Sequence, residues 1–192
     1  MFKEQIKSAI LVFLILTIIT GVIYPLFVTA FCQLFFHNKA NGSLIYKDGK
    51  PIGSSFIGQY FDKPEYFWPR PSATSPMPYN AASSCGSNLG PSNPLLNDAL
   101  KKRIELYKAA DPNNTNQIPV DLVTASASGL DPHISLAGAY YQTARISRIR
   151  NLSQETVENL INKHATKRLL GILGEPVVNV LELNVGLDEY KK

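Results

Sequence analysis

The stretch SAILVFLILTIITGVIYPLFVTAFCQLFF, from Ser8 to Phe36, sets the architecture of this chain. Its 29 residues include no Asp, Glu, Lys or Arg, and most positions are Leu, Ile, Val, Phe or Ala. As a helix it would reach about 43 Å at ~1.5 Å per residue, against a bilayer hydrocarbon core of ~30 Å. We therefore predict one transmembrane helix, with Gly21 and Pro25 as positions where it can kink.

A cleaved signal peptide is the alternative interpretation of this stretch. Val28–Ala30 has the small residues of a cleavage site, and Lys3 and Lys7 form a basic leading segment. However, the apolar run is longer than the usual length of about 7–15 residues, and aromatic residues continue to Phe36. These two observations favour a retained anchor.

The charges around the helix predict its orientation. Two lysines precede the apolar run, whereas only His37 and Lys39 follow it closely. Because basic residues are enriched on the cytoplasmic side of membrane helices, we expect the N-terminus in the cytoplasm. The predicted regions are a cytoplasmic N-terminus over 1–7, a transmembrane anchor over 8–36 and an extracytoplasmic soluble domain over 38–192.

Charge and cysteine content exclude some classes of protein. The formal net charge is only +4, without the dense basic stripe of a nucleic-acid-binding protein. Cys32 lies in the apolar stretch and Cys85 in the soluble part, so we expect no disulfide between them. The soluble part must then fold around a hydrophobic core, which is feasible at its size, and Cys85 is expected to be a small buried residue.

The soluble part begins with a predicted hairpin and a long loop. Ser43–Phe61 has two β-rich runs on either side of Asp48-Gly49, which is a typical hairpin turn. Asp62–Pro94 is rich in proline, serine and asparagine but also contains several aromatic residues, unlike a disordered linker. We expect this segment to be an ordered loop that serves as an interaction surface.

A helix is predicted after the long loop, with Asn93 as its N-cap and Pro94 in its first turn. It should end before the polar segment Asp111–Pro119, and a short strand should begin over Val120–Thr124. Apolar and amphipathic residues recur at helical spacing at Leu96, Ala99, Leu100, Arg103 and Tyr107.

Further helices are expected in the last third of the chain. Asp131 is a predicted N-cap followed by Pro132, and this helix should run to about Arg150. Another should begin at Ser153 and end near Gly174 and Pro176, with one apolar stripe formed by Val157, Leu160, Ile161 and Ile172.

A final strand is predicted over Val177–Asp188, because several of its odd-numbered positions are apolar. The soluble part therefore combines a few strands with three helices, and we assign it to the α+β class. The whole chain is predicted to be one N-terminal transmembrane helix followed by a single mixed helix and strand domain.

The segment Asp121–Ser135 (DLVTASASGLDPHIS) contains the residue types of a serine hydrolase. Candidate catalytic groups are Ser126 or Ser128 with His133 and an aspartate, and a membrane-anchored exported serine hydrolase is the alternative function. The G-x-S-x-G pattern of a nucleophile elbow is missing, and Asp131 has a structural role as a cap. We therefore favour a structural segment and predict no catalytic residue.

Metal and nucleotide motifs are weak. The histidines are His37, His133 and His164, and their spacing does not match a zinc site, so we predict no metal ligand. The Gly/Ser-rich segment Ser83–Gly90 lacks the Lys-Ser/Thr ending of a Walker A loop. An anchored exported domain without a catalytic set points to an accessory subunit that acts by contact.

Four segments strongly resemble the C subunit family of the bacterial Kdp potassium-transporting P-type ATPase. They are Gly53–Ala73, Gly86–Pro94, Pro119–Ser135 and Gly171–Asp188, and the resemblance extends over nearly the whole chain, including the single anchor.

The resemblance implies a non-catalytic accessory subunit of a high-affinity, ATP-driven potassium uptake pump in the bacterial inner membrane. Its implied partners are a channel-like potassium-binding subunit, a P-type ATPase subunit and a small single-helix subunit, besides the lipid bilayer. Its implied role is to assemble and stabilise the complex, which uses ATP on another chain; we predict no cofactor in this one. Within the long loop, the expected partner contacts are Tyr66, Trp68, Arg70 and Leu89.

The family has also been proposed to assist ATP binding by the pump subunit through a Gln-Ser-Gly-Gly-Ser-like segment. The matching residues here are Ser84, Gly86, Ser87 and Asn88, whereas Ser83 replaces the glutamine and Cys85 a glycine. Loss of the glutamine amide removes the proposed hydrogen-bonding group. The predicted orientation would also separate this segment from cytosolic ATP.

Overall fold

The computed structural model describes residues 2–190, and the chain divides into two units, Met1–Leu44 and Ile45–Lys192. In the first unit, one helix is long and apolar enough to cross a membrane; it covers Phe2–Phe35 and is not buried. It consists of α1 (Phe2–Ile18), a π-helical turn (Ile19–Ile23) and α2 (Tyr24–Phe35), and it is followed by α3 (His37–Ala40).

The π-helical turn lies where the sequence predicts a kink. It contains Gly21 and ends two residues before Pro25, which has no N–H to donate to the carbonyl of Gly21. In membrane helices, local π-helical adjustments can satisfy backbone groups that a proline leaves without a partner. The hydroxyls of Thr17 and Thr20 donate to the carbonyls of Phe13 (2.8 Å) and Leu16 (2.7 Å), so both are satisfied within the helix.

The second unit starts with the hairpin of β1 (Leu44–Lys47) and β2 (Lys50–Ser54). Asp48 and Gly49 both have positive φ values, 51° and 74°, as a two-residue type I′ turn requires. Residues 55–93 then form the long loop, and all of them lack helix and strand. The predicted hairpin turn and the ordered loop are both confirmed.

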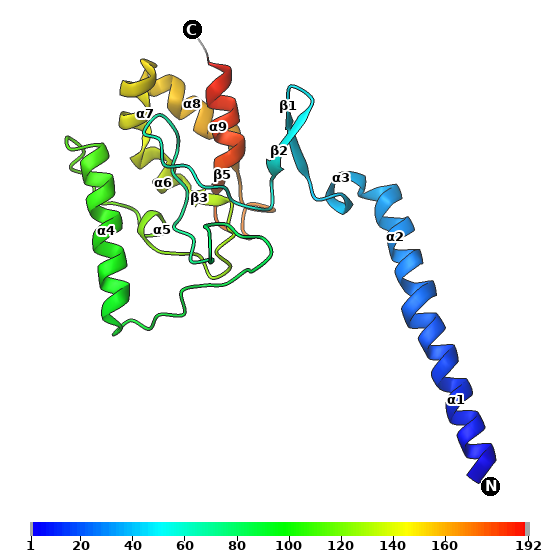
Figure 1. The fold of residues 1–192 in the computed structure, drawn as a ribbon. Coiled ribbons are helices and arrows are strands. Elements are labelled where there is room, and N and C mark those ends of the chain that lie inside the picture. The colour runs from blue at the N-terminus through cyan, green and yellow to red at the C-terminus, as the bar shows by residue number, and fades with distance from the viewer. Residues whose placement is uncertain (1, 191–192) are drawn as a thin grey trace. The chain divides into compact units, whose positions relative to one another are not determined.

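The rest of the second unit is a small sheet surrounded by helices (Figure 1). Its sheet order is β3-β5-β4, with both pairs antiparallel, and helices α6, α8 and α9 contact β5. The elements are α4 (Pro94–Ala110), α5 (Val120–Val123), β3 (His133–Ser135), α6 (Leu136–Tyr141), α7 (Thr143–Arg150), α8 (Gln154–His164), β4 (Ala165–Thr166), β5 (Val177–Asn179) and α9 (Val180–Glu189).

The core joins this sheet and its helices to the long loop. Phe67 and Trp68 from the loop are 0% and 3% exposed, and Tyr107 from α4 is 1% exposed. The sheet and helices add buried aliphatic side chains, among them Leu122, Ile134, Ile146, Val157, Leu160, Ile161, Val178, Leu183 and Leu187. The loop is therefore ordered because its aromatic residues form part of the core.

Two predicted caps are confirmed. The side chain of Asn93 accepts from the N–H of Leu95 (3.0 Å) at the start of α4, and Ser153 accepts from Thr156 (3.0 Å) at the start of α8. Both residues close a helix N-terminus whose first N–H groups have no partner within the helix.

Of the other predicted elements, one has the wrong type and three have the wrong bounds. The strand over Val120–Thr124 is the short helix α5, in which Thr124 N–H donates to the Val120 carbonyl (3.0 Å). The helix from Asp131 to Arg150 starts five residues later, at Leu136, because His133–Ser135 pairs with β5 as strand β3. It is also interrupted at Gln142, between α6 and α7.

The helix from Ser153 ends at His164, not near Gly174. Ile172 is therefore not on its apolar stripe and is 75% exposed, whereas Val157, Leu160 and Ile161 are buried as predicted. The strand predicted over Val177–Asp188 covers only Val177–Asn179, after which the side chain of Asn179 caps α9 by accepting from Glu182 N–H (3.1 Å). Pairing with β3 and β4 makes the first three residues a strand.

Candidate functional site

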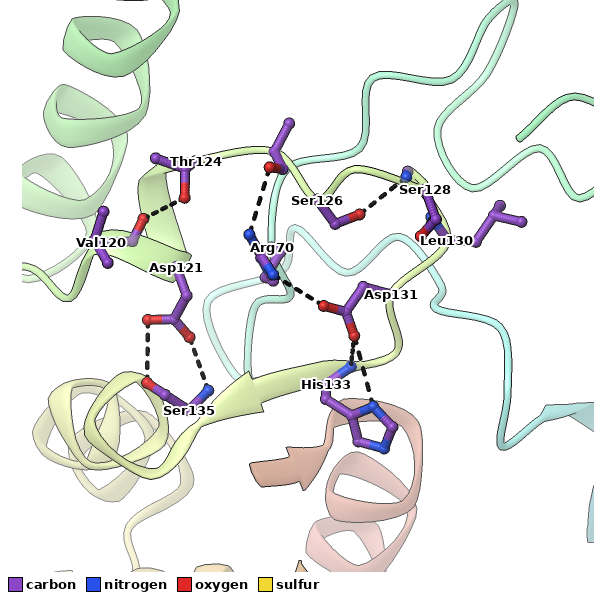
Figure 2. A network of polar contacts seen from close by, with 12 residues as sticks. Arg70, Val120, Asp121, Thr124, Ser126, Ser128, Leu130, Asp131, His133 and Ser135 are labelled. Atoms are coloured by element: carbon purple, nitrogen blue, oxygen red, sulfur yellow. Dashed lines mark hydrogen bonds and ion pairs between the residues drawn. The ribbon is translucent and has the colours of Figure 1, made fainter. Parts of the chain in front are cut away.

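The segment Asp121–Ser135, which suggested a hydrolase, forms a network of polar contacts (Figure 2). Asp121 holds the start of α6: its carboxylate accepts from the N–H of Ser135 (2.7 Å) and from the Ser135 hydroxyl (3.0 Å). The Ser135 oxygen in turn accepts from Gly138 N–H (2.9 Å) as the N-cap of α6. Asp121 and Ser135 therefore act together as a helix cap.

The two candidate nucleophiles have local roles. The hydroxyl oxygen of Ser126 accepts from Gly129 N–H (2.9 Å), and that of Ser128 accepts from Leu130 N–H (3.1 Å). Such bonds from Ser side chains to nearby N–H groups stabilise turns. Gly129 has φ +66°, and a Cβ there would lie 2.6 Å from the Cys85 carbonyl oxygen, so this turn requires glycine.

Asp131 lies between Arg70 and His133, and its carboxylate bonds to both (Figure 2). Nη1 of Arg70 donates to Oδ2 (3.0 Å), the N–H of His133 donates to Oδ1 (3.0 Å), and the ring Nδ1 of His133 is 3.5 Å from Oδ1. Burial by itself raises the pKa of Asp131, but the hydrogen bonds from His133 and Arg70 outweigh it, so this pKa lies below its ordinary value. Asp131 is thus a charged junction between the loop and β3.

These contacts do not form a hydrolytic triad. A triad needs a serine hydroxyl within hydrogen-bond reach of the histidine, with a third group orienting the ring. Within residues 2–190, the hydroxyl oxygens of Ser126 and Ser128 accept from backbone N–H groups, and the ring of His133 faces Asp131. The residues provide turns, a helix cap and an ion pair, which fix β3 and α6 against the loop.

Two buried amides hold the long loop to the helices. Asn184 of α9 accepts from Phe67 N–H (2.8 Å) and donates to the Phe67 carbonyl (3.0 Å). Gln142 does the same for Trp68, at 2.8 and 3.1 Å. Each amide therefore satisfies both backbone groups of one loop residue, as a neighbouring strand would, which allows an irregular segment to be buried.

Among the charged side chains of residues 2–190, that of Arg145 in α7 is the most deeply buried, at 1% exposure. Its guanidinium donates to the carbonyls of Pro64 and Tyr66 (3.0 Å to Tyr66) and to Gln142 Oε1 (2.6 Å), and it lies 4.4 Å from the Trp68 ring centroid. Burial lowers the pKa of Arg145 to about 10, so it remains charged at neutral pH. Sequence reasoning missed this residue together with Gln142 and Asn184, because helical spacing gives no signal for polar side chains that bond to a distant loop.

The four predicted partner contacts have unequal exposure. Trp68 is 3% exposed, so its ring belongs to the core and offers little surface to another chain, contrary to what its place in the loop suggested. Tyr66, Arg70 and Leu89 are half-buried, and the Tyr66 hydroxyl donates to Asp188 (3.3 Å). Whether these residues contact a partner stays a prediction.

The segment proposed for nucleotide contact, Ser84 with Gly86, Ser87 and Asn88, packs against the loop at 125–129. The Ser84 hydroxyl donates to the Ser128 carbonyl (3.0 Å), and a Cβ on Gly86 would lie 2.8 Å from the Ala127 carbonyl oxygen. Cys85 is half-buried, not fully buried as predicted, with its thiol 3.5 Å from the Ala73 carbonyl. Any role of this segment with nucleotide stays a prediction.

A groove of about 400 Å³ lies between α4 and these loops. Its lining is mainly apolar, with Leu96, Leu100 and Val123 among its residues, and Ser87, Leu89, Lys102 and Arg103 also contribute. Of the residues predicted for nucleotide or partner contact, Ser87 and Leu89 line this groove, whereas Ser84 and Trp68 do not.

Comparisons with known proteins agree on one family. The model of the "K+-transporting ATPase, c chain" family (KdpC) matches residues 6–189. A "Potassium-transporting ATPase KdpC subunit" of Ralstonia nicotianae is 58% identical over 186 residues, which is 97% of this chain and 91% of the relative.

Two further relatives with the same name cover the chain as fully. The protein from Dechloromonas aromatica is 56% identical over 190 residues, with 99% of this chain and 100% of the relative covered. That from Methylibium petroleiphilum is 59% identical over 186 residues, or 97% of each chain. The match includes the apolar N-terminal helix as well as the loop and sheet of the second unit. The chain therefore belongs to the KdpC family of potassium-transporting ATPase subunits.

Proposed function

We propose that this chain is the accessory subunit that assembles and stabilises a high-affinity, ATP-driven potassium uptake pump of the bacterial inner membrane. One observation carries the proposal: the family match runs over residues 6–189 and so includes the apolar helix and the soluble unit together. The chain's role as an accessory subunit, not a catalytic one, follows from its family.

The proposed topology has the N-terminus in the cytoplasm and the second unit outside it. Support comes from Lys3 and Lys7 at the N-terminal end of the apolar helix Phe2–Phe35 and from the length of that helix. The proposed partners are the channel-like potassium-binding subunit, the P-type ATPase subunit and a small single-helix subunit. ATP is used on another chain in this proposal, and contact of Ser84–Asn88 with nucleotide is not needed for it.

The serine hydrolase alternative has no support. The serines and aspartates of Asp121–Ser135 are engaged in turns, a helix cap and an ion pair. Family membership independently points to the potassium pump.

The test is complementation of a pump produced without this chain. We expect the remaining subunits to yield little assembled complex and little potassium-stimulated ATPase activity, and the full-length chain to restore both. A double variant, Ser126→Ala with His133→Ala, should restore ATPase activity to within about twofold, because side-chain truncations outside a catalytic set have small effects on turnover.

Two outcomes would contradict the proposal. Assembly and activity that are normal without the chain would remove its accessory role. Loss of turnover in a fully assembled complex containing the double variant would show that the segment has a chemical role after all.

A further inference from the structure

A pocket of about 350 Å³ lies between the loop that follows α4, the junction of α6 with α7, and α8. We refer to it as the polar pocket. Its volume is at the lower end of the range for small-molecule sites, about 300–1,000 Å³. Apart from Ala144, all its lining residues have hydrogen-bonding side chains, and the uncharged ones include Asn113, Thr115, Asn116 and Gln154. The lining therefore suits a small ligand that is itself rich in hydrogen-bonding groups.

Two buried oxygen atoms of the lining residues have no hydrogen-bond partner among residues 2–190. They are Oδ2 of Asp111 and Oγ1 of Thr143, and both residues are 4% exposed. A buried polar atom without a partner costs free energy, so such atoms are rare in folded proteins. A single water occupies only about 30 Å³ and would fill little of the pocket, whereas a larger ligand can fill it and pair with both oxygens.

Contacts between the surrounding elements form the pocket in advance. The N–H of Asn114 donates to the Asp111 carbonyl (3.1 Å), and its side-chain amide donates to the Tyr141 carbonyl (3.0 Å). The Tyr140 hydroxyl donates to Asn162 of α8 (2.7 Å). The loop after α4 and helix α8 are thus each fixed to α6. A pocket that is already ordered loses less entropy when a ligand binds.

The charges of the pocket favour a neutral ligand. Oδ1 of Asp111 accepts from Nη1 of Arg148 at 2.8 Å, so these two charges offset each other, and the remaining charged residue of the lining, Glu158, is exposed. An anion would face Oδ2 of Asp111, which only accepts hydrogen bonds. A metal ion would lack ligands, because residues 2–190 contain no group of three His, Cys, Asp or Glu residues that could hold one.

Hydroxyl groups match this lining better than ammonium groups do. A hydroxyl both donates and accepts, as do the amides and the threonine hydroxyls around the pocket. It can therefore donate to Oδ2 of Asp111 or accept from the hydroxyl of Thr143. An ammonium group has three donors and no acceptor, so it offers nothing to the hydroxyl hydrogen of Thr143 or to the amide N–H groups.

We propose that the polar pocket binds a neutral polyhydroxy compound of about the size of a hexose. Its hydroxyls pair with Asp111 and Thr143, and its C–H groups contact the tyrosines of the lining, which combine an apolar ring with a polar tip. The inference goes beyond the proposed function and does not depend on it, because it uses only residues of this pocket.

Isothermal titration of the full-length chain, in a detergent without a sugar headgroup, tests the proposal. The probes are D-glucose, D-galactose and sorbitol, with methylammonium as the competing cation. We expect at least one polyol to bind saturably with a Kd of about 1–10 mM, the affinity that ligand efficiency allows for so small a molecule. Its Kd should be the same at about 0.05 and 0.5 M salt, because salt does not screen a neutral ligand.

A pair of threonine variants links the binding to the pocket. Thr143→Val removes the buried hydroxyl, and Thr166→Val is the matched control at an exposed position of β4. We expect Thr143→Val to weaken polyol binding by at least about tenfold and Thr166→Val to bind like the parent. Because the Thr143 hydroxyl is buried without a partner, its loss should leave the thermal midpoint of the free chain unchanged or raise it.

Three outcomes would overturn the proposal. They are no saturable binding of any of the three polyols up to about 50 mM, equal polyol affinity of Thr143→Val and the parent, and binding of methylammonium in place of the polyols. None of them would change the expected assembly and activity of the pump.

Discussion

Arg145 shows at the scale of one residue how a charged group orders an irregular loop. Its guanidinium satisfies the carbonyls of Pro64 and Tyr66 and lies against the face of Trp68. Loss of the guanidinium would remove a hydrogen bond from these carbonyls and from the buried Gln142 Oε1, and hydrogen bonds from a charged donor contribute more than neutral ones. We therefore expect Arg145 to contribute strongly to the free energy of unfolding.

Replacing Arg145 by methionine tests this role. We expect Arg145→Met to lower the free energy of unfolding of the full-length chain by about 3 kcal/mol. The control Lys101→Met, at an exposed position of α4, should change it by less than about 0.5 kcal/mol. Urea unfolding followed by Trp68 emission measures both, and equal midpoints for the two variants would show that Arg145 does not hold the loop.

Asp188 is the residue that joins three parts of the unit. Its carboxylate bonds to Lys47 (3.1 Å) in the hairpin, to Arg150 (3.0 Å) in α7 and to the Tyr66 hydroxyl (3.3 Å) in the loop. Burial raises the pKa of Asp188, but the contacts with Lys47 and Arg150 lower it by more, so that it lies below the ordinary value of 3.8.

The lowered pKa of Asp188 predicts a pH dependence of stability. A carboxylate with a lower pKa in the folded state stabilises it above the unfolded pKa of about 3.8, and this contribution is lost as the pH falls through the folded value. The parent should be more stable than Asp188→Asn at neutral pH, and the difference should shrink below about pH 4. Thermal unfolding across pH 2–7 measures this, and a constant difference over that range would contradict the assignment.

At the scale of elements, local chemistry predicted some structure well. Asp48-Gly49 closes a hairpin, and Asn93 and Ser153 cap helices, because each depends on residues within a few positions. His133–Ser135 became a strand against a helix signal, because pairing with Val177–Asn179 is a contact between distant segments. No local pattern could reveal that pairing.

In the candidate site, too, features set by nearby residues were predicted correctly, and features set by contacts between distant segments were not. The absence of a nucleophile elbow correctly favoured turns and caps for Ser126 and Ser128. The burial of Trp68 and the exposure of Ile172 both depend on tertiary packing. The aromatic composition of the loop predicted a surface contact for Trp68, and helical spacing predicted a buried Ile172, so both predictions were wrong.

Two glycines in the Gly/Ser-rich segment allow a matched test of its packing. A Cβ on Gly86 would lie 2.8 Å from the Ala127 carbonyl oxygen, whereas nothing lies within 4 Å of one on Gly90. We expect Gly86→Ala to destabilise the fold by about 1–3 kcal/mol. Gly90→Ala should be neutral or stabilising by up to ~1 kcal/mol. Equal thermal midpoints would mean that segment 84–88 is not held against the loop at Ala127.

At the scale of the whole molecule, the chain consists of an apolar N-terminal helix and a separate mixed helix and strand unit. The proposed function requires these to lie in different environments, with the helix in the bilayer and the second unit outside the cytoplasm. In this arrangement the lysines of the first unit, Lys3 and Lys7, set the orientation of the helix.

Labelling with a membrane-impermeant thiol reagent on intact cells, with any outer membrane permeabilised, tests this arrangement. Val120→Cys places an exposed thiol in the second unit, and Phe2→Cys places one at the N-terminal end of the apolar helix. The parent chain gives the background labelling of Cys32 and Cys85. We predict that Val120→Cys is labelled in intact cells and that Phe2→Cys is labelled only after the inner membrane is lysed. Labelling of Val120→Cys only after lysis would contradict the proposed topology.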